Sequence, residues 1–326
     1  MSLKLSKLNM FILAMIVSII ISNIIVQISN IDLMIPEDWH KPHQISTENI
    51  FHELKRNYTT IWQGVEIKTN ELGLRDKNYP LAKGNNTKRV IVIGDSITFG
   101  GLIKQSKSYP EVLETMLNKN SSYFYEVWNA GVSCYNSYEE LTELKRLIKY
   151  EPDIIIYGFF QNDLKNSCFV FDKETFFKEH KLLNYLDKSI LGRISIYKLI
   201  QKNIYNNDQR KKQSLFNNKK INPEQNKQAL FDMINITKER KIQFIILNIP
   251  FIHIKYYSEK EEELINQIKE NNETIVIDII DSYKLAGKEW YKILRALSTD
   301  DSHPNNLGHE LIANATYEKL SETRFI

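Results

Sequence analysis

Five short runs of apolar, largely β-branched residues place the strongest constraint on the fold of this chain. They are residues 89–94 (Arg-Val-Ile-Val-Ile-Gly), 125–129, 153–157, 243–248 and 274–278. Runs of this length without a polar face are typical of strands buried on both sides of a sheet. Between them, helical spacing of apolar residues occurs at 109–117, 137–149, 223–240 and 259–270. This alternation predicts parallel pairing through right-handed crossovers, and therefore a three-layer α/β/α sandwich with about five parallel strands.

The alternation has one long interruption. Residues 165–221 separate the third and fourth predicted strands, and a connection of this length indicates a lid, a small subdomain or a disordered insertion. Its polar and basic part, residues 201–220, favours a solvated surface, with contact to anionic lipid head groups or an acidic polymer as the alternative. After the last strand, a helix is predicted from about Pro304 onwards. Its expected apolar face consists of Leu307, Leu311, Ile312 and Leu320.

The N-terminus carries an uncharged apolar run from Met10 to Ile28, close to the ~20 residues of a membrane-spanning helix. Lys4 and Lys7 precede this run, and acidic residues follow it at positions 32, 37 and 38. Because positive flanking charge stays in the cytoplasm, the rest of the chain is predicted to be extracytoplasmic. A cleaved signal peptide is the alternative, although the run is long for one and no small-x-small cleavage site follows. We expect a single-pass anchor over residues 1–30, a lead-in segment over 31–87 and the main domain over 88–326.

Composition excludes several classes of protein. The 43 basic and 40 acidic residues give a net charge of +3, which is too balanced to predict a nucleic-acid partner. Cys134 and Cys168 are the only cysteines, so neither a disulfide scaffold nor a thiolate zinc site is expected. They are predicted either to pair with each other outside the cytoplasm or to remain buried thiols. The oligomeric state is left open.

A serine flanked by glycines directly follows the first predicted strand. The motif is Gly94-Asp95-Ser96-Ile97-Thr98-Phe99-Gly100. Ligands of open parallel sheets bind beyond the carboxyl ends of the strands, which is where this serine is predicted to lie. The flanking glycines allow the backbone to turn sharply and expose the hydroxyl. Surface turns also contain Gly-Asp-Ser, so the assignment depends on the partners of the serine.

The partners are found near the C-terminus, in Asp300-Asp301-Ser302-His303. A serine hydroxyl is a weak nucleophile unless a base removes its proton, and that base needs an orienting group. The three-residue spacing lets the Asp300 carboxylate and the His303 imidazole lie on the same side of one turn. We therefore predict a catalytic triad of Ser96, His303 and Asp300. The alternative for His303 is a polar residue at a helix start, ahead of Pro304.

Two further blocks follow the second and third predicted strands. Asn129-Ala-Gly131 ends one, and Asn162-Asp163 follows the other. A tetrahedral intermediate needs preorganised N–H donors, and the backbone amides of Ser96 and Gly131 with the side-chain amide of Asn162 are predicted to form this oxyanion hole. Asp95 and Asp163 are expected to support these residues. Taken singly, such a glycine is more often a turn residue and such an asparagine a cap.

These four blocks, in this order, resemble the SGNH hydrolase family, also called GDSL-like esterases and lipases, from about Asn70 to the C-terminus. The resemblance implies a flavodoxin-like sandwich, a Ser-His-Asp triad without a metal or cofactor, and hydrolysis or transfer of acyl esters. The four name-giving positions correspond to Ser96, Gly131, Asn162 and His303. Two positions depart from the family pattern. Phe160 stands where a glycine usually precedes the asparagine by two residues, and Asp301 occupies a position often held by glycine.

The expected function is that of an extracytoplasmic serine esterase acting on acyl esters, such as acetyl esters, of a surface glycan or a lipid. An O-acyltransferase that modifies a cell-surface polysaccharide with the same triad is the first alternative. A non-catalytic glycan-binding protein on the same scaffold is the second. The fold alone does not choose among them, and the acyl chain length is not predicted.

Overall fold

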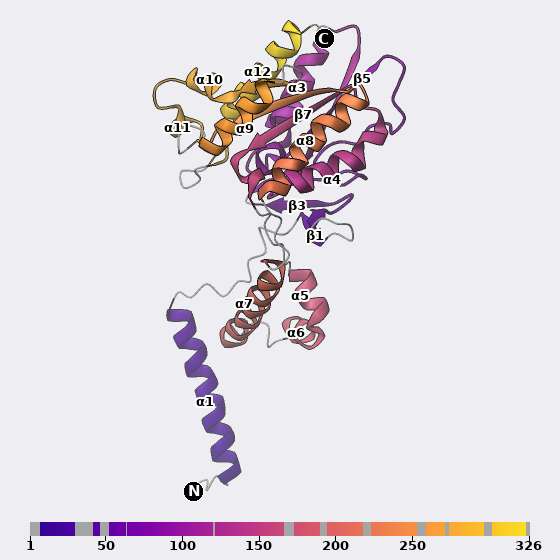
Figure 1. Cartoon of the computed structure of the whole chain (residues 1–326). Helices are drawn as coiled ribbons and strands as arrows, with labels where there is room; N and C mark the ends of the chain where they lie inside the picture. The colour runs from indigo at the N-terminus through magenta and orange to yellow at the C-terminus, as the bar shows by residue number, and fades with distance from the viewer. Residues whose placement is uncertain are drawn as a thin grey trace. The chain divides into compact units, whose positions relative to one another are not determined.

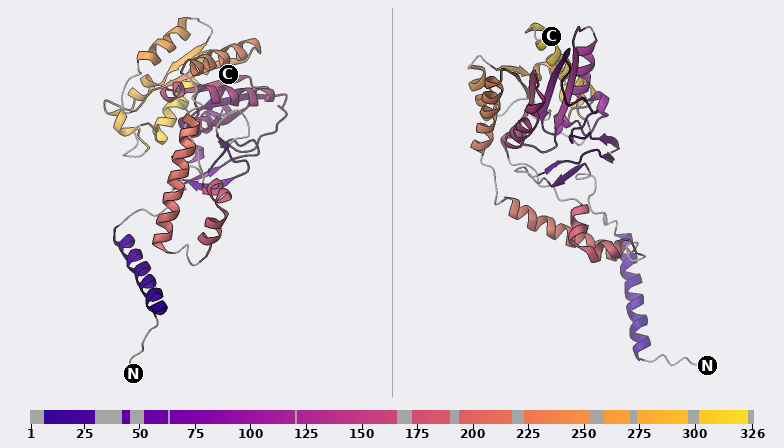
Figure 2. Two further views of the ribbon diagram at one scale, coloured as in Figure 1. Left: turned by 60° about the horizontal axis from the view of Figure 1, so that its bottom comes forward. Right: turned by 90° about the vertical axis from the view of Figure 1, so that its right-hand side faces the viewer.

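The computed structural model describes residues 7–29, 42–45, 52–62, 64–119, 121–165, 173–189, 194–217, 223–252, 259–270, 274–296 and 302–323. The chain divides into two compact units, whose elements are drawn in Figures 1 and 2. One unit comprises residues 41–170 and 220–326, and the other comprises residues 1–40 and 171–219. The larger unit contains the α/β sandwich, whereas residues 171–219, which belong to the predicted insertion, fall in the smaller unit.

A five-stranded parallel sheet forms the centre of the larger unit. Its strands are β5 (Thr87–Gly94), β6 (Phe124–Gly131), β7 (Ile154–Phe160), β8 (Gln243–Ile249) and β9 (Ile275–Asp278). They lie in the order β6-β5-β7-β8-β9, with parallel register throughout. The chain leaves β5 first towards one edge and later returns to the other side of β5, so a topological switch point lies at its carboxyl end. The predicted fold class is confirmed.

Helices cover both faces of this sheet (Figure 1). One side holds α3 (Tyr109–Asn118), α10 (Ile279–Lys284) and α12 (Asn306–Glu322), and the other holds α4 (Ser137–Leu147), α8 (Pro223–Glu239) and α9 (Glu259–Glu270). Side chains alternate along β5, because Val90 and Val92 pack in the first layer whereas Ile91 and Ile93 pack in the second. Burial on both faces explains why the strands read as continuous apolar runs. The short helical elements of this unit are α2 (Ser96–Phe99), η1 (Gln105–Lys107), η2 (Ile148–Tyr150), η3 (Gln161–Leu164) and α11 (Trp290–Ile293).

The C-terminal helix α12 begins where the sequence predicts, but its buried face is shifted. Asn305 caps it by accepting a hydrogen bond from the Gly308 backbone N–H at 3.2 Å. Ile312 and Leu320 are buried as expected, whereas Leu307 is 41% exposed. The residues that complete the buried face are Gly308, His309, Ala313 and Thr316. Because these four residues are small or polar, a pattern based on aliphatic residues predicted only part of the buried face.

The lead-in segment contains two short hairpins that the sequence pattern did not reveal. They pair β1 (His43–Ile45) with β2 (His52–Leu54) and β3 (Thr59–Trp62) with β4 (Val65–Lys68). The His52 Nε2 atom lies 2.8 Å from the Ser133 carbonyl oxygen, and the Tyr135 hydroxyl donates to the His52 carbonyl at 2.8 Å. The first hairpin therefore packs on the loop that follows β6. Burial lowers the pKa of His52 to about 4.

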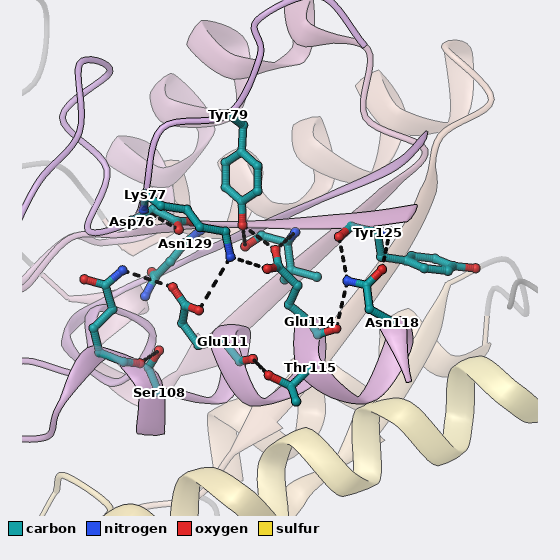
Figure 3. A network of polar contacts seen from close by, with 12 residues as sticks. Asp76, Lys77, Tyr79, Ser108, Glu111, Glu114, Thr115, Asn118, Tyr125 and Asn129 are labelled. Carbon is teal, nitrogen blue, oxygen red and sulfur yellow. Dashed lines mark hydrogen bonds and ion pairs between the residues drawn. The ribbon is translucent and has the colours of Figure 1, made fainter. Parts of the chain in front are cut away.

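A polar network ties the rest of the lead-in segment to the sheet (Figure 3). Glu114 of α3 is its centre, because its carboxylate accepts hydrogen bonds from the Tyr79 hydroxyl and the Lys77 ammonium group. The same carboxylate accepts the Val127 backbone N–H of β6 at 2.8 Å. One buried side chain thus joins the lead-in segment, α3 and β6.

The smaller unit is helical where it is described. It contains α1 (Lys7–Ile28), α5 (Lys173–Glu179), α6 (Lys181–Asp187) and α7 (Ser195–Asn217). Residues Asn9–Val26 of α1 have a mean hydropathy of 2.4 and are long and apolar enough to cross a membrane, a property that signal sequences share. The Ser195 backbone N–H donates to Asn23 Oδ1 at 2.6 Å, which joins α7 to α1. The interruption between the third and fourth predicted strands is therefore mainly helical, and most of its basic run belongs to α7.

Candidate active site

Ser96 is the first residue of α2, immediately after the carboxyl end of β5. Asp95 caps this helix, because its Oδ1 atom accepts the Ile97 backbone N–H at 2.9 Å. The helix ends after a single turn at Gly100, which adopts a left-handed conformation with φ 69°. This sharp strand–turn–helix passage raises the serine above the end of the sheet, as the glycine-flanked motif predicts.

Three glycines at the ends of neighbouring strands give α2 its place. Gly94 of β5 is in register with Gly131 of β6 on one side and with Gly158 of β7 on the other. A Cβ atom on Gly131 would lie 2.6 Å from the Thr98 carbonyl carbon, and one on Gly158 would lie 2.6 Å from the Thr98 hydroxyl. Side chains at these positions would therefore displace the turn that carries Ser96. The sequence predicts Gly131 as an oxyanion donor but did not reveal this packing role.

The structure brings Ser96 and His303 together. The His303 Nε2 atom lies 2.9 Å from Ser96 Oγ, although the residues are 207 positions apart in the sequence. Backbone pairing holds the histidine in place, since the Ala296 N–H donates to the His303 carbonyl at 2.8 Å and the Asn305 N–H donates to the Leu294 carbonyl at 2.6 Å. The segment before α12 is thereby fixed against the segment after α11.

The predicted third member of the triad, Asp300, lies outside the described residues, as does Asp301. A different carboxylate, that of Asp95, lies beside the pair, with Oδ2 3.4 Å from Ser96 Oγ. Burial raises the pKa of Asp95, while the hydrogen bond from Ile97 N–H and the charge of His303 act in the opposite direction. The Ser96 hydroxyl therefore has two neighbours that could accept its hydrogen, and His303 is the nearer of the two.

The three predicted oxyanion donors lie at the carboxyl ends of three adjacent strands: Ser96 after β5, Gly131 as the last residue of β6, and Asn162 after β7. The Gly131 N–H donates to Asn129 Oδ1 at 3.1 Å. This N–H must therefore turn away from the Asn129 side chain when it binds an oxyanion. The Asn162 side chain forms a hydrogen bond with Asp95. An amide nitrogen carries two hydrogens, so a second one is available to a substrate oxygen.

Asp163 stabilises the turn that presents Asn162. It is fully buried, and its Oδ2 atom accepts the Phe160 backbone N–H at 2.8 Å. The Tyr157 hydroxyl lies between two carboxylates, 3.1 Å from Asp163 Oδ2 and 2.7 Å from Glu140 Oε2. Burial raises the pKa of Asp163 and of Glu140 well above their ordinary values. Phe160, the departure from the family pattern, thus still contributes its backbone N–H, and Glu140 is a buried neighbour that the sequence did not single out.

No group of three or more histidine, cysteine or carboxylate side chains is arranged to bind a metal within the part of the chain that the structure describes. The described groups around Ser96 are an imidazole, a carboxylate and amide donors. Such groups support acyl transfer through an activated serine.

Comparison with known proteins places this arrangement in a family. The family model described as GDSL-like lipase/acylhydrolase matches residues 90–316. No curated protein matches the chain. Similar solved structures include LAE5, an alpha/beta hydrolase enzyme from the metagenome of Lake Arreo, with 17% identity, a TM-score of 0.47 and coverage of 74% of this chain and 96% of that one.

Two further solved structures are also similar to this chain. TesA shows 16% identity and a TM-score of 0.46, with 72% of this chain and 99% of that chain covered. A catalytic mutant of Axe2, an acetylxylan esterase from Geobacillus stearothermophilus, shows 16% identity and a TM-score of 0.45, with 73% and 95% covered. The family match includes Ser96, Gly131, Asn162 and His303, and it confirms the resemblance seen in the sequence. The chain therefore belongs to the GDSL-like lipase/acylhydrolase family and is a serine hydrolase that acts on ester bonds.

Proposed function

We propose that this protein is a membrane-anchored, extracytoplasmic esterase that removes an acyl group, such as acetyl, from a surface glycan or a lipid. The observation that carries the proposal is the 2.9 Å contact between Ser96 Oγ and His303 Nε2. For His303 to accept the serine proton in this contact, its ring must be neutral with Nε2 unprotonated, so its single ring N–H is on Nδ1. Asp300 is proposed to accept that hydrogen and orient the ring.

The reaction follows from these positions. Ser96 Oγ attacks the acyl carbonyl carbon while its proton moves to His303 Nε2, and the carbonyl oxygen becomes an oxyanion. The backbone amides of Ser96 and Gly131 and the side-chain amide of Asn162 are proposed to stabilise that charge. The imidazolium then protonates the departing alcohol oxygen as its bond to the acyl carbon breaks. Water then attacks the acyl carbon as the same imidazole takes its proton, and the imidazolium returns that proton to Ser96 Oγ as the bond between Oγ and the acyl carbon breaks and the acid leaves.

The location outside the cytoplasm rests on three features. The span Asn9–Val26 in α1 is apolar enough to cross a membrane, and Lys4 and Lys7 precede it. Positive charge at this end favours an N-terminus that stays in the cytoplasm. Cys134 is disulfide-bonded, and disulfides persist in oxidising compartments.

Replacement of Ser96 by alanine in the purified full-length protein tests the proposal. We expect hydrolysis of p-nitrophenyl acetate and labelling by a fluorophosphonate probe to disappear together, because both reactions need the activated hydroxyl. Ser108→Ala is the matched control, since this fully buried serine donates to the Gln105 carbonyl and leaves the Ser96–His303 pair intact. Undiminished turnover by Ser96→Ala would reject the proposal. Faster acyl transfer to a sugar than to water would instead identify an O-acyltransferase.

A further inference from the structure

The segment Asn70-Glu-Leu-Gly-Leu-Arg-Asp76 lies outside the residues matched by the family, yet its polar side chains are buried. Arg75 is fully buried and Asp76 is 2% exposed. Burial of an arginine is unusual and costs several kcal/mol unless its donors are well paired. The contacts of these two residues therefore indicate what the segment does.

Arg75 binds the end of the helix that carries Ser96. Its guanidinium group donates to the carbonyls of Phe99 at 2.7 Å and Ile103 at 2.8 Å, and also to the carbonyl of Gly100. The last carbonyls of a helix have no partner within the helix, and that end carries partial negative charge. Burial lowers the pKa of Arg75 only to about 10, so the group remains a cation at neutral pH. One planar cation thus satisfies three carbonyls at and beyond the end of α2.

Asp76, the next residue, binds a different strand. Its Oδ2 atom accepts the Asn129 backbone N–H at 2.8 Å, and its Oδ1 atom accepts the Lys77 backbone N–H at 2.7 Å (Figure 3). The side chain of Asn129 in turn accepts the Gly131 N–H, one of the proposed oxyanion donors. Asp76 is therefore two hydrogen bonds away from that donor.

A tight turn before Arg75 and Asp76 explains how these two adjacent residues reach α2 and β6 respectively. Asn70 closes the turn, since its Oδ1 atom accepts the N–H groups of Leu72 at 2.9 Å and Leu74 at 3.0 Å, and its Nδ2 atom donates to the Lys77 carbonyl at 3.0 Å. Gly73 has a φ of 75°, a conformation that favours glycine. The turn is thus fixed by its own side chain before Arg75 and Asp76 leave it.

We propose that Arg75 and Asp76 are positioning residues of the active site, which hold the Ser96 helix and the Gly131 end of β6 in a fixed relation to each other. The inference rests on the proposed function, because it concerns the geometry of the same nucleophile and oxyanion donor. The segment acts through the backbone and touches neither substrate nor reacting atoms. Its loss is expected to lower kcat rather than substrate affinity, because a 1 Å displacement of a catalytic group costs roughly 100-fold in rate.

The protein contains a matched control for Arg75 at the opposite end of β5. Arg89 is also fully buried, donates to the carbonyls of Pro80 at 2.8 Å and Tyr150 at 2.6 Å, and pairs with Glu126 at 2.8 Å. Arg89 is the third residue of β5, whereas Ser96 lies just beyond the last residue of this strand. A purely structural role predicts the same behaviour for both arginines, and a positioning role does not.

The experiment compares Arg75→Met with Arg89→Met in the full-length protein. For each variant we measure the thermal midpoint of unfolding, kcat and KM for p-nitrophenyl acetate, and the rate of fluorophosphonate labelling. We expect Arg75→Met to lose roughly 100-fold in kcat and in labelling rate with little change in KM. Arg89→Met is expected to lower the thermal midpoint but to keep its kcat while folded. Added methylguanidinium should restore part of the kcat of Arg75→Ala, because it supplies the planar donors.

Equal kcat for the folded Arg75→Met and Arg89→Met proteins, or no rescue by methylguanidinium, would overturn the inference. If the arginine variants fail to fold, Asp76→Asn decides, because it keeps the shape of the side chain and weakens its bond to Asn129. A lower kcat at constant KM supports the inference, and an unchanged kcat overturns it. An unsubstituted protein that neither hydrolyses ester nor takes up the probe would reject the proposed function instead.

Discussion

Replacement of Gly131 by alanine tests how the active site is assembled. The new Cβ atom would lie 2.6 Å from the Thr98 carbonyl carbon, whereas carbon atoms in contact are separated by ~3.5 Å. Either α2 or the end of β6 must therefore move by about 1 Å. Because Arg75 holds the far end of α2, the helix cannot shift freely as a unit.

The expected loss follows from that displacement. Ser96 is two residues from Thr98, and its Oγ atom now lies 2.9 Å from His303 Nε2. A movement of about 1 Å breaks or weakens this hydrogen bond and lowers kcat/KM roughly 100-fold. Overpacking should also destabilise the protein by about 1–3 kcal/mol.

The assay is hydrolysis of p-nitrophenyl acetate, with urea unfolding of the same samples. Gly84→Ala is the matched control, since its Cβ atom would meet the Thr87 hydroxyl at 2.8 Å, and a hydroxyl can rotate away. We expect that variant to keep its activity. A Gly131→Ala protein with unchanged kcat/KM and unchanged stability would show that α2 does not rest on the end of β6 as described.

Three further predictions concern the triad, pH and the membrane. Asp300→Asn should lower kcat by about 10³–10⁴-fold through loss of histidine orientation, whereas Asp301→Asn should not; equal activity of the two variants would exclude Asp300 from the triad. The pKa of His52 falls from 6.5 to about 4 on folding. Between these two pH values the unfolded chain binds a proton at His52 that the folded protein does not, so the free energy of unfolding decreases as the pH falls from 6.5 to about 4. The decrease due to this residue is about 3 kcal/mol. In urea unfolding, the free energy of unfolding of His52→Gln should fall by about 3 kcal/mol less between pH 7 and pH 4 than that of the unsubstituted protein. The same pH dependence in both proteins would contradict a buried neutral histidine. Deletion of residues 1–30 should move the enzyme from the membrane fraction to the soluble fraction with its hydrolysis of p-nitrophenyl acetate retained, and continued sedimentation with membranes would contradict the single anchor.

The sheet and its helices could be read from the sequence because their signals are local. The run at residues 89–94 and its counterparts are apolar on both faces, and the helical stretches keep their apolar spacing over several turns. The two hairpins of the lead-in segment lacked such a signal. Their strands are only three or four residues long, too short for an alternating pattern to stand out from a loop.

The buried polar residues near the active site show a second limit of prediction from the sequence. Arg75, Asp76 and Glu140 have side chains that are normally exposed, and no neighbour in the sequence marks them as buried. The partners of these side chains come from elements that are distant in the sequence, so the contacts could not be predicted from the segment itself.

The sequence by itself determined which short segments form the strands and helices of the sandwich, because hydrophobic periodicity and turn residues act between close neighbours, and it supplied the candidate catalytic residues. Only the tertiary structure decided that Ser96 and His303 meet, that Gly131 makes room for the helix that begins at Ser96, and that Arg75 holds this helix at its other end. These contacts join residues that are distant along the chain. They depend on strand order and on the packing of whole elements, which no short stretch of sequence contains.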